Sequence, residues 1–264
     1  YLHDSLPNAT YVGFTGTPVD GTIEVFGGVV DAYTMTEAVK DGITVNLVYD
    51  GRAAKVMLNQ DKVRQIEEYY AQCELEGANE HQVEESQKAV AKMEVIIGDP
   101  DRLRAVAEDF IKHYETRVAE GATVAGKAMF VCSNRNIAYD FYKIVKELRP
   151  EWTEKKICDD GVVLSEKDKK ELKPMEKIKL VMTRNKDDEK DLFDMLGTKE
   201  DRKEFDRQFK NPKSNFKIAI VVDMWLTGFD VPELDTIYID KPIQQHTLIQ
   251  TISRVNRVCE GKDK

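Results

Sequence analysis

Short apolar runs alternate with amphipathic stretches along much of the chain, and this alternation predicts strands joined by helices. Helical spacing predicts helices over residues 137–148 and 245–258, with Ser133 or Asn134 as the cap of the first. The run at 216–222 is almost wholly apolar, which is typical of a central strand in a parallel sheet. Further apolar, β-prone runs lie at residues 10–14, 43–49, 128–132, 178–182 and 234–239. The pattern predicts a three-layer α/β domain with a parallel sheet over roughly residues 122–264.

Residues 61–120 differ from this pattern, because Glu, Gln, Ala and Lys dominate them. Apolar residues at helical spacing form one stripe over Val63, Ile66 and Tyr70 and another over Val106, Phe110 and Ile111. The segment has 8 Lys/Arg against 15 Asp/Glu, a net charge of −7 within a chain total of −9, whereas residues 241–264 have 5 against 2, a net +3. We expect a helical insertion or connector with a solvated acidic face, and a basic C-terminal end that could bind phosphates.

Composition limits the class of protein. Hydrophobic residues make up 41% of the 264 residues and charged residues 33%, which predicts a folded globular protein. The apolar runs are far shorter than the ~20 residues of a membrane helix, so we expect no membrane association. The four cysteines form no C-x-x-C pair. We therefore expect no metal site, no disulfide framework and a reducing, cytoplasmic environment. The chain begins at Tyr1 without a leader, and we expect it to be a piece of a longer protein.

Three segments combine residues that suit phosphate chemistry. Gly228 and Asp230 follow the 216–222 strand, where ligands of open α/β sheets bind. Arg254 and Arg257 are three residues apart, so a helix would present both guanidinium groups on one face. Gln250 precedes Arg254 by four residues and falls on the same side, and hydroxyl residues and a glycine follow the 10–14 run. Taken singly, each segment is also compatible with an ordinary turn or a solvated basic face.

Together the three segments resemble motifs III, V and VI of the superfamily 2 helicase-like ATPases. The resemblance rests on F-T-G-T-P at 14–18, V-D-M-W-L-T-G-F-D-V-P at 222–232 and Q-T-I-S-R-V-N-R at 250–257. Three further strings resemble the motor (R) subunits of type I restriction enzymes: D-A-Y-T-M-T-E-A-V-K-D-G at 31–42, G-K-A-M-F-V-C-S at 126–133 and Y-I-D-K-P at 238–242.

This resemblance implies a RecA-like fold in three parts: the end of a first motor domain at residues 1–30, a connector with the acidic helical segment at 31–121, and a second RecA-like helicase domain at 122–264. It implies ATP hydrolysis that drives translocation and cleavage of double-stranded DNA by the whole restriction endonuclease. The sequence contains no G-x-x-x-x-G-K-[ST] loop, no Asp-Glu-x-His box and no recognisable D…E-x-K nuclease set. We therefore expect the 264 residues alone to be inactive, with the ligands of Mg²⁺ outside them.

The resemblance also assigns roles to individual residues. Arg254 and Arg257 are expected to face ATP as arginine fingers, with Gln250 supporting the same cleft. Gly228 and Asp230 are expected to contact the ribose or hold an arginine. The residues expected to contact DNA phosphates or to couple cleft closure to DNA are Thr15, Thr17, Ser133, Asn134, Arg135, Thr183, Arg184 and Thr227. For Trp225 two readings stay open, a wedge in DNA and a core side chain.

The resemblance implies four partners: double-stranded DNA, the first RecA-like domain of the same chain, and the methyltransferase and specificity subunits. Two alternatives stay open. The chain could be the second lobe of another superfamily 2 helicase or remodeller, or a non-catalytic nucleic-acid-binding module.

Overall fold

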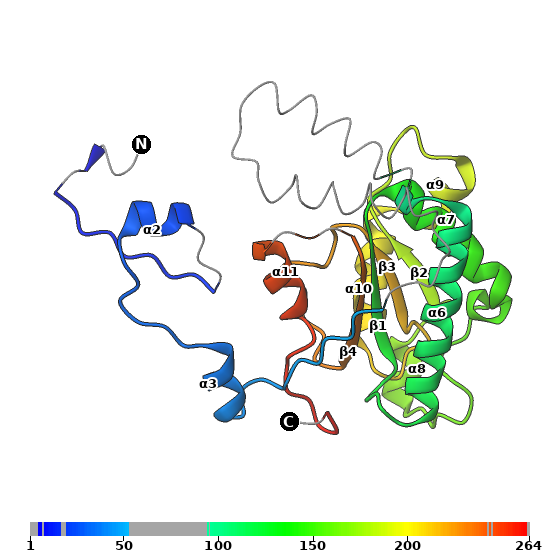
Figure 1. Cartoon of the computed structure of the whole chain (residues 1–264). Coiled ribbons are helices and arrows are strands. Elements are labelled where there is room, and N and C mark those ends of the chain that lie inside the picture. The colour runs from blue at the N-terminus through cyan, green and yellow to red at the C-terminus, as the bar shows by residue number, and fades with distance from the viewer. Residues whose placement is uncertain are drawn as a thin grey trace.

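A computed structural model describes residues 5–6, 8–16, 20–52, 94, 96–241, 243 and 245–262. The predicted alternation of strands and helices in the C-terminal half is confirmed (Figure 1). In chain order the main elements are α2 (Asp20–Phe26), α3 (Met35–Lys40), α6 (Pro100–Ala119), β1 (Lys127–Cys132), α7 (Arg135–Leu148), the 3-10 turn η1 (Pro150–Thr153), α8 (Glu166–Glu171), β2 (Ile178–Val181), α9 (Lys190–Leu196), α10 (Lys199–Lys210), β3 (Ile218–Val221), β4 (Leu234–Asp240) and α11 (Gln245–Ile252).

The four strands form one parallel sheet in the order β2-β3-β1-β4. Ala128 pairs with Ile218 on one side and with Thr236 on the other, so β1 lies inside the sheet. Every residue of β1, β2 and β3 is buried, which agrees with their near-continuous apolar sequence. Because the strands are parallel, the loops that follow them all gather at one edge of the sheet, called here the carboxyl edge.

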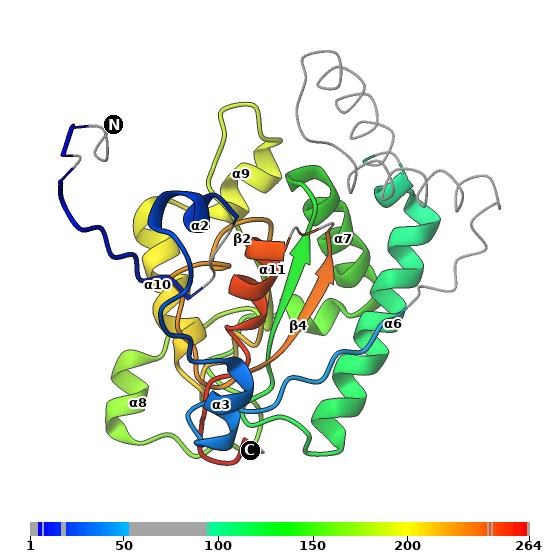
Figure 2. The same cartoon turned by 60° about the vertical axis from the view of Figure 1, so that its left-hand side comes forward.

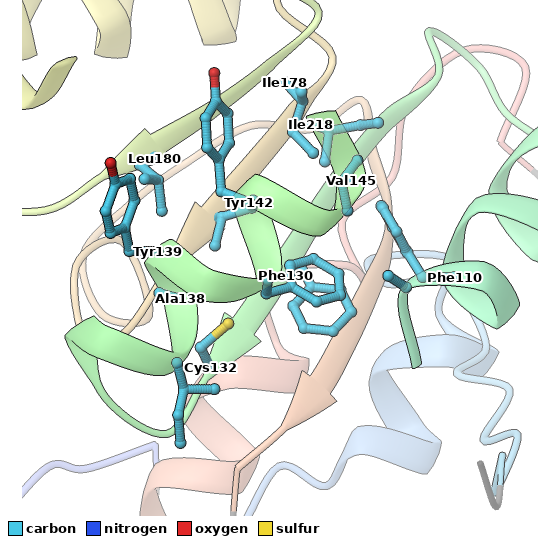
Figure 3. Packing of buried hydrophobic residues seen from close by; sticks show 14 of the residues in the cluster. Phe110, Phe130, Cys132, Ala138, Tyr139, Tyr142, Val145, Ile178, Leu180 and Ile218 are labelled. Atoms are coloured by element: carbon cyan, nitrogen blue, oxygen red, sulfur yellow. The ribbon is translucent and has the colours of Figure 1, made fainter. Parts of the chain in front are cut away.

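Alternate side chains of the strands face two different layers, so the molecule has three layers as predicted. Phe130 and its equivalents on β2 and β3 pack against α6 and α7, and Figure 3 shows this cluster around the aromatic rings. Val131 and its equivalents pack on the opposite face, against Phe209 of α10 and the loop after β3. Figures 1 and 2 show α6 and α7 on one side of the sheet and α11 on the other.

Helix α6 comes from the acidic part of the sequence, yet it contributes to the core. The predicted stripe is confirmed there, because Phe110 and Ile111 are buried. The Phe110 ring meets Phe130 with 5.2 Å between ring centroids and Tyr238 with 4.8 Å, both edge to face. The acidic residues of α6 face solvent or pair with cations, so only one face of this helix is solvated. The stripe over 63–70 lies outside the described residues.

Two predicted strands are wrong. Residues 10–14 form no strand, and Phe14 is 94% exposed, because no strand of the described chain lies beside them to pair with. Residues 43–49 form only one antiparallel bridge, between Thr44 and Arg257, and the Val45 N–H donates to the Asn256 carbonyl at 2.7 Å. This contact joins the connector to the end of the chain, and Figure 2 shows the connector running on from α3 toward α6.

The helix predicted over 245–258 is shorter than expected and ends at Ile252. The hydroxyls of Thr251 and Ser253 donate to the carbonyls of Thr247 and Gln250, which competes with the helical pattern. The chain then turns and extends to reach the connector. Within the described part of the chain, no helix is both long and apolar enough to cross a bilayer.

Candidate functional site

The candidate site lies at the carboxyl edge of the sheet, where two segments meet. One is the loop at 222–232, which follows β3. The other is the turn at 253–257, which follows α11. Ligands of open α/β sheets bind at this edge because the loops converge there around backbone groups that the strands leave unpaired.

The loop after β3 is held by apolar side chains and exposes its polar ones. Leu226, Phe229 and Val231 are buried, whereas the residues between them are exposed. Gly228 has φ of +68°, a left-handed conformation that favours glycine, and a Cβ added there would meet nothing within 4 Å. The conformation rather than crowding therefore explains the glycine, and the open space above it leaves room for a ligand. Asp230 is exposed beside it.

Arg254 is fixed on this loop. Its Nη1 donates to the Phe229 carbonyl at 2.9 Å, and its Nε donates to the Gln250 carbonyl at 3.1 Å. Burial of the guanidinium, and then the charge of Arg257, lower the pKa of Arg254. Gln250, on α11, thus supports Arg254 through its backbone oxygen.

Arg257 meets the same loop one residue further on. Its Nη1 lies 2.7 Å from Oδ2 of Asp230, with 38% of the Arg257 side chain and 55% of the Asp230 side chain exposed. Of the two roles expected for Asp230, the structure contains the contact with an arginine. Because both side chains remain accessible to solvent, Arg257 can exchange Asp230 for another anion.

The two arginines come together for a different reason from the predicted one. They do not lie on one helix face, because α11 ends before either of them. The turn after Ile252 instead brings both side chains against consecutive residues of the loop, Phe229 and Asp230. Guanidinium groups present paired N–H donors, which can match the oxygens of a carboxylate or a phosphate.

The predicted DNA-contact residues after β1 and β2 form a second group, braced by one ion pair. Arg135 Nη2 donates to both carboxylate oxygens of Asp188 at 2.6 Å, and Arg135 Nη1 donates to the Thr183 carbonyl at 2.7 Å. Asn134 caps α7 by accepting from the Ile137 N–H at 2.9 Å, so it is the capping residue of the two proposed. Arg135 and Asn134 therefore hold the shape of these loops.

The other predicted contact residues are distributed around this edge. The Ser133 hydroxyl is buried without a hydrogen-bond partner in the described chain, and the Arg184 guanidinium lies 4.3 Å from the centre of the Phe193 ring. Thr183 and Thr227 are exposed. Thr15 is exposed on the N-terminal segment, which Figure 1 shows apart from the sheet, and Thr17 lies outside the described residues.

Three features of this edge were not predicted. Asp188 anchors Arg135, and Lys241 bridges two loops by binding the Asp223 carboxylate at 2.5 Å and the Val222 carbonyl at 3.3 Å. The connector at Val45 is bonded to the turn that bears the arginines. Nothing in local spacing marks these contacts, because each joins residues far apart in sequence.

The described residues do not fit a magnesium site. They contain no group of three His, Cys, Asp or Glu side chains placed to hold a metal ion. The two carboxylates of the loop after β3 are already paired, Asp230 with Arg257 and Asp223 with Lys241. The donors that this edge offers instead are the two guanidinium groups of Arg254 and Arg257.

Comparisons with known proteins match both the N-terminal and the C-terminal part of the chain. Residues 124–264 match the family model of type I restriction enzyme subunit R domain 3, and residues 1–84 match that of the SWI2/SNF2 ATPases. The chain is 37% identical to the type I restriction enzyme HindI endonuclease subunit of Haemophilus influenzae, over 100% of this chain and 23% of the relative. It is 35% identical to the putative type I restriction enzyme MjaIXP endonuclease subunit of Methanocaldococcus jannaschii, over 99% of this chain and 23% of the relative.

The chain thus spans about a quarter of the length of these curated relatives. One family model covers the whole parallel sheet and the arginine turn, and a second covers the N-terminal segment with the first part of the connector. On these matches, the chain belongs to the family of type I restriction enzyme R subunits.

Proposed function

We propose that this chain is the second RecA-like lobe of an ATP-driven DNA translocase within a longer R subunit. In that subunit, ATP hydrolysis would drive movement of double-stranded DNA before cleavage. The match of residues 1–84 to SWI2/SNF2 ATPases supports an ATPase, and the relatives' names include an endonuclease subunit. The 264 residues alone are inactive in this proposal, because the phosphate-binding loop and the nuclease residues belong to other parts of the subunit.

One observation carries the proposal: Arg254 and Arg257 meet the Gly228–Asp230 bend at the carboxyl edge of the sheet. Phosphoryl transfer spreads negative charge over the γ-phosphate oxygens, and cationic donors aimed there lower the barrier. The two arginines supply such donors from this lobe when it closes on the nucleotide held by the first lobe. Asp230 holds Arg257 in the open state and releases it to the phosphate on closure.

The loops after β1, β2 and β3 contact the DNA backbone in this proposal. Thr183 and Thr227 present exposed hydroxyls at the same edge, and the Arg135–Asp188 pair fixes the loop around Thr183. Hydroxyls and backbone amides suit contacts that do not read sequence, which a translocating motor needs. The methyltransferase and specificity subunits would supply site recognition.

The test uses the R subunit that carries this sequence, assembled with its partners and duplex DNA. Arg254→Ala and Arg257→Ala should each lower the kcat of DNA-stimulated ATP hydrolysis by roughly 10³-fold, the effect typical of an arginine finger. Arg104→Ala is the matched control, because its exposed ion pair with Glu147 lies on the α6–α7 face of the sheet. Near-normal ATPase in both site variants would refute the assignment.

A further inference from the structure

The loop after β3 contains a tryptophan in an unusual backbone conformation. Trp225 has φ of +68°, and it is the one residue other than glycine with positive φ in the described part of the chain. The left-handed region is unfavourable for a bulky side chain, whereas glycine and asparagine enter it more readily. Gly228 adopts the same region three residues later. A tryptophan at this place therefore implies that its ring performs a role that a better-suited residue could not.

The ring packs on the residue that receives Arg254. Trp225 and Phe229 stack in parallel, with 4.2 Å between ring centroids and 2° between ring planes. Phe209 of α10 supports the pair, at 5.3 Å from Trp225 and 6.0 Å from Phe229. Phe229 is 5% exposed, and its ring packs against both the indole and Phe209 of the core.

This stack controls where the arginine acceptors lie. The Phe229 carbonyl accepts from Arg254 Nη1, and the next residue, Asp230, binds Arg257. Val255, between the two arginines, packs against the same apolar cluster as Trp225. Movement of the Phe229 ring would therefore shift both acceptors relative to the arginine turn.

The two earlier readings of Trp225 fit less well. A core tryptophan would be fully enclosed, as Trp152 is at 4% exposure on the opposite face of the sheet, whereas Trp225 is half-buried. A wedge between two bases needs both ring faces free, and Phe229 covers one face of the indole.

We propose that Trp225 is a positioning residue, which holds Phe229 and Asp230 in the places where they orient Arg254 and Arg257. This inference rests on the proposed ATPase function. It assigns to Trp225 an effect on catalysis through the arginines, without contact to nucleotide or DNA.

The experiment measures DNA-stimulated ATP hydrolysis by the R subunit that carries this sequence. Trp225→Asn removes the ring but tolerates the left-handed backbone. A small misplacement of a catalytic group can cost roughly 10²-fold, so we expect kcat to fall by about 10- to 100-fold while KM for ATP changes by less than about threefold. Trp225→Phe keeps a ring over Phe229 and should restore most of kcat. Trp152→Phe is the matched control, which should leave kcat unchanged.

A double variant separates positioning from a general loss of structure. Because Trp225 acts through Arg254 as well as Arg257, Trp225→Asn should reduce kcat by a smaller factor in the Arg254→Ala background than in the parent subunit. Multiplicative effects in the double variant, or a Trp225→Asn enzyme with parental kcat, would overturn the inference while leaving the proposed function intact. Normal ATPase in both Arg254→Ala and Arg257→Ala would overturn both.

Discussion

Loss of the Asp230–Arg257 contact should have a small effect on stability and a larger effect on catalysis. Asp230→Asn removes the charge that faces Arg257 at 2.7 Å and leaves the side-chain shape nearly unchanged. Both side chains are more than a third exposed, so solvent screens the pair, and such surface pairs contribute about 0.2–1 kcal/mol to stability. We therefore expect a loss of at most ~1 kcal/mol in the free energy of unfolding.

The expected effect on catalysis is larger, because Arg257 loses the group that orients it before closure. A fall of about 10²-fold in kcat corresponds to ~2.7 kcal/mol of activation free energy. That is more than the pair can contribute to stability. The assay compares steady-state ATP hydrolysis with urea unfolding for Asp230→Asn and for Glu147→Gln, a control that breaks the exposed Glu147–Arg104 pair. If Asp230→Asn keeps kcat within about twofold, or if the control loses as much activity, the reasoning about orientation is wrong.

Three further predictions concern the elements around the site. Arg135→Ala should destabilise the protein by about 1–3 kcal/mol in urea unfolding, because it leaves the Asp188 carboxylate, whose side chain is only 7% exposed, without its cation. Val45→Pro removes the N–H that donates to the Asn256 carbonyl, so we expect kcat for ATP to fall several-fold as the arginine turn loosens; an unchanged kcat would mean that the connector has no influence there. Burial lowers the pKa of His113 below its ordinary 6.5, so the unfolded state binds the proton more readily than the folded state. Stability should therefore decrease as the pH falls below 6.5. His113→Gln should make the urea unfolding midpoint differ less between pH 7 and pH 5 than it does in the parent protein.

The sheet could be predicted because its apolar runs are buried on both sides. Each residue of β1 and β3 packs against a helical layer or the loop after β3, so local composition alone indicates a central strand. The same reasoning failed at residues 10–14, where an apolar run is present but no strand of the described chain lies beside it. A β-prone sequence forms a strand only where a partner supplies hydrogen bonds.

The site could be predicted in part. The motifs indicated that a glycine–aspartate bend and two arginines belong together, and the structure brings these residues into contact. The helix predicted over 245–258, which was expected to present both arginines on one face, was too long. The hydroxyls of Thr251 and Ser253 compete for its last carbonyls. The left-handed Trp225 could not be predicted, because its conformation depends on the stack with Phe229 and on the core beneath it.

The central claim is that Arg254 and Arg257 face the transferred phosphate. Its most direct test is a crystal structure of the R subunit with duplex DNA and a transition-state analogue of the γ-phosphate. We expect guanidinium nitrogens of both arginines to lie within about 3 Å of the analogue's oxygen or fluorine atoms, with Arg257 released from Asp230. A structure in which the lobes are closed on the analogue while both arginines keep their bonds to Phe229 and Asp230 and stay out of its reach would contradict it.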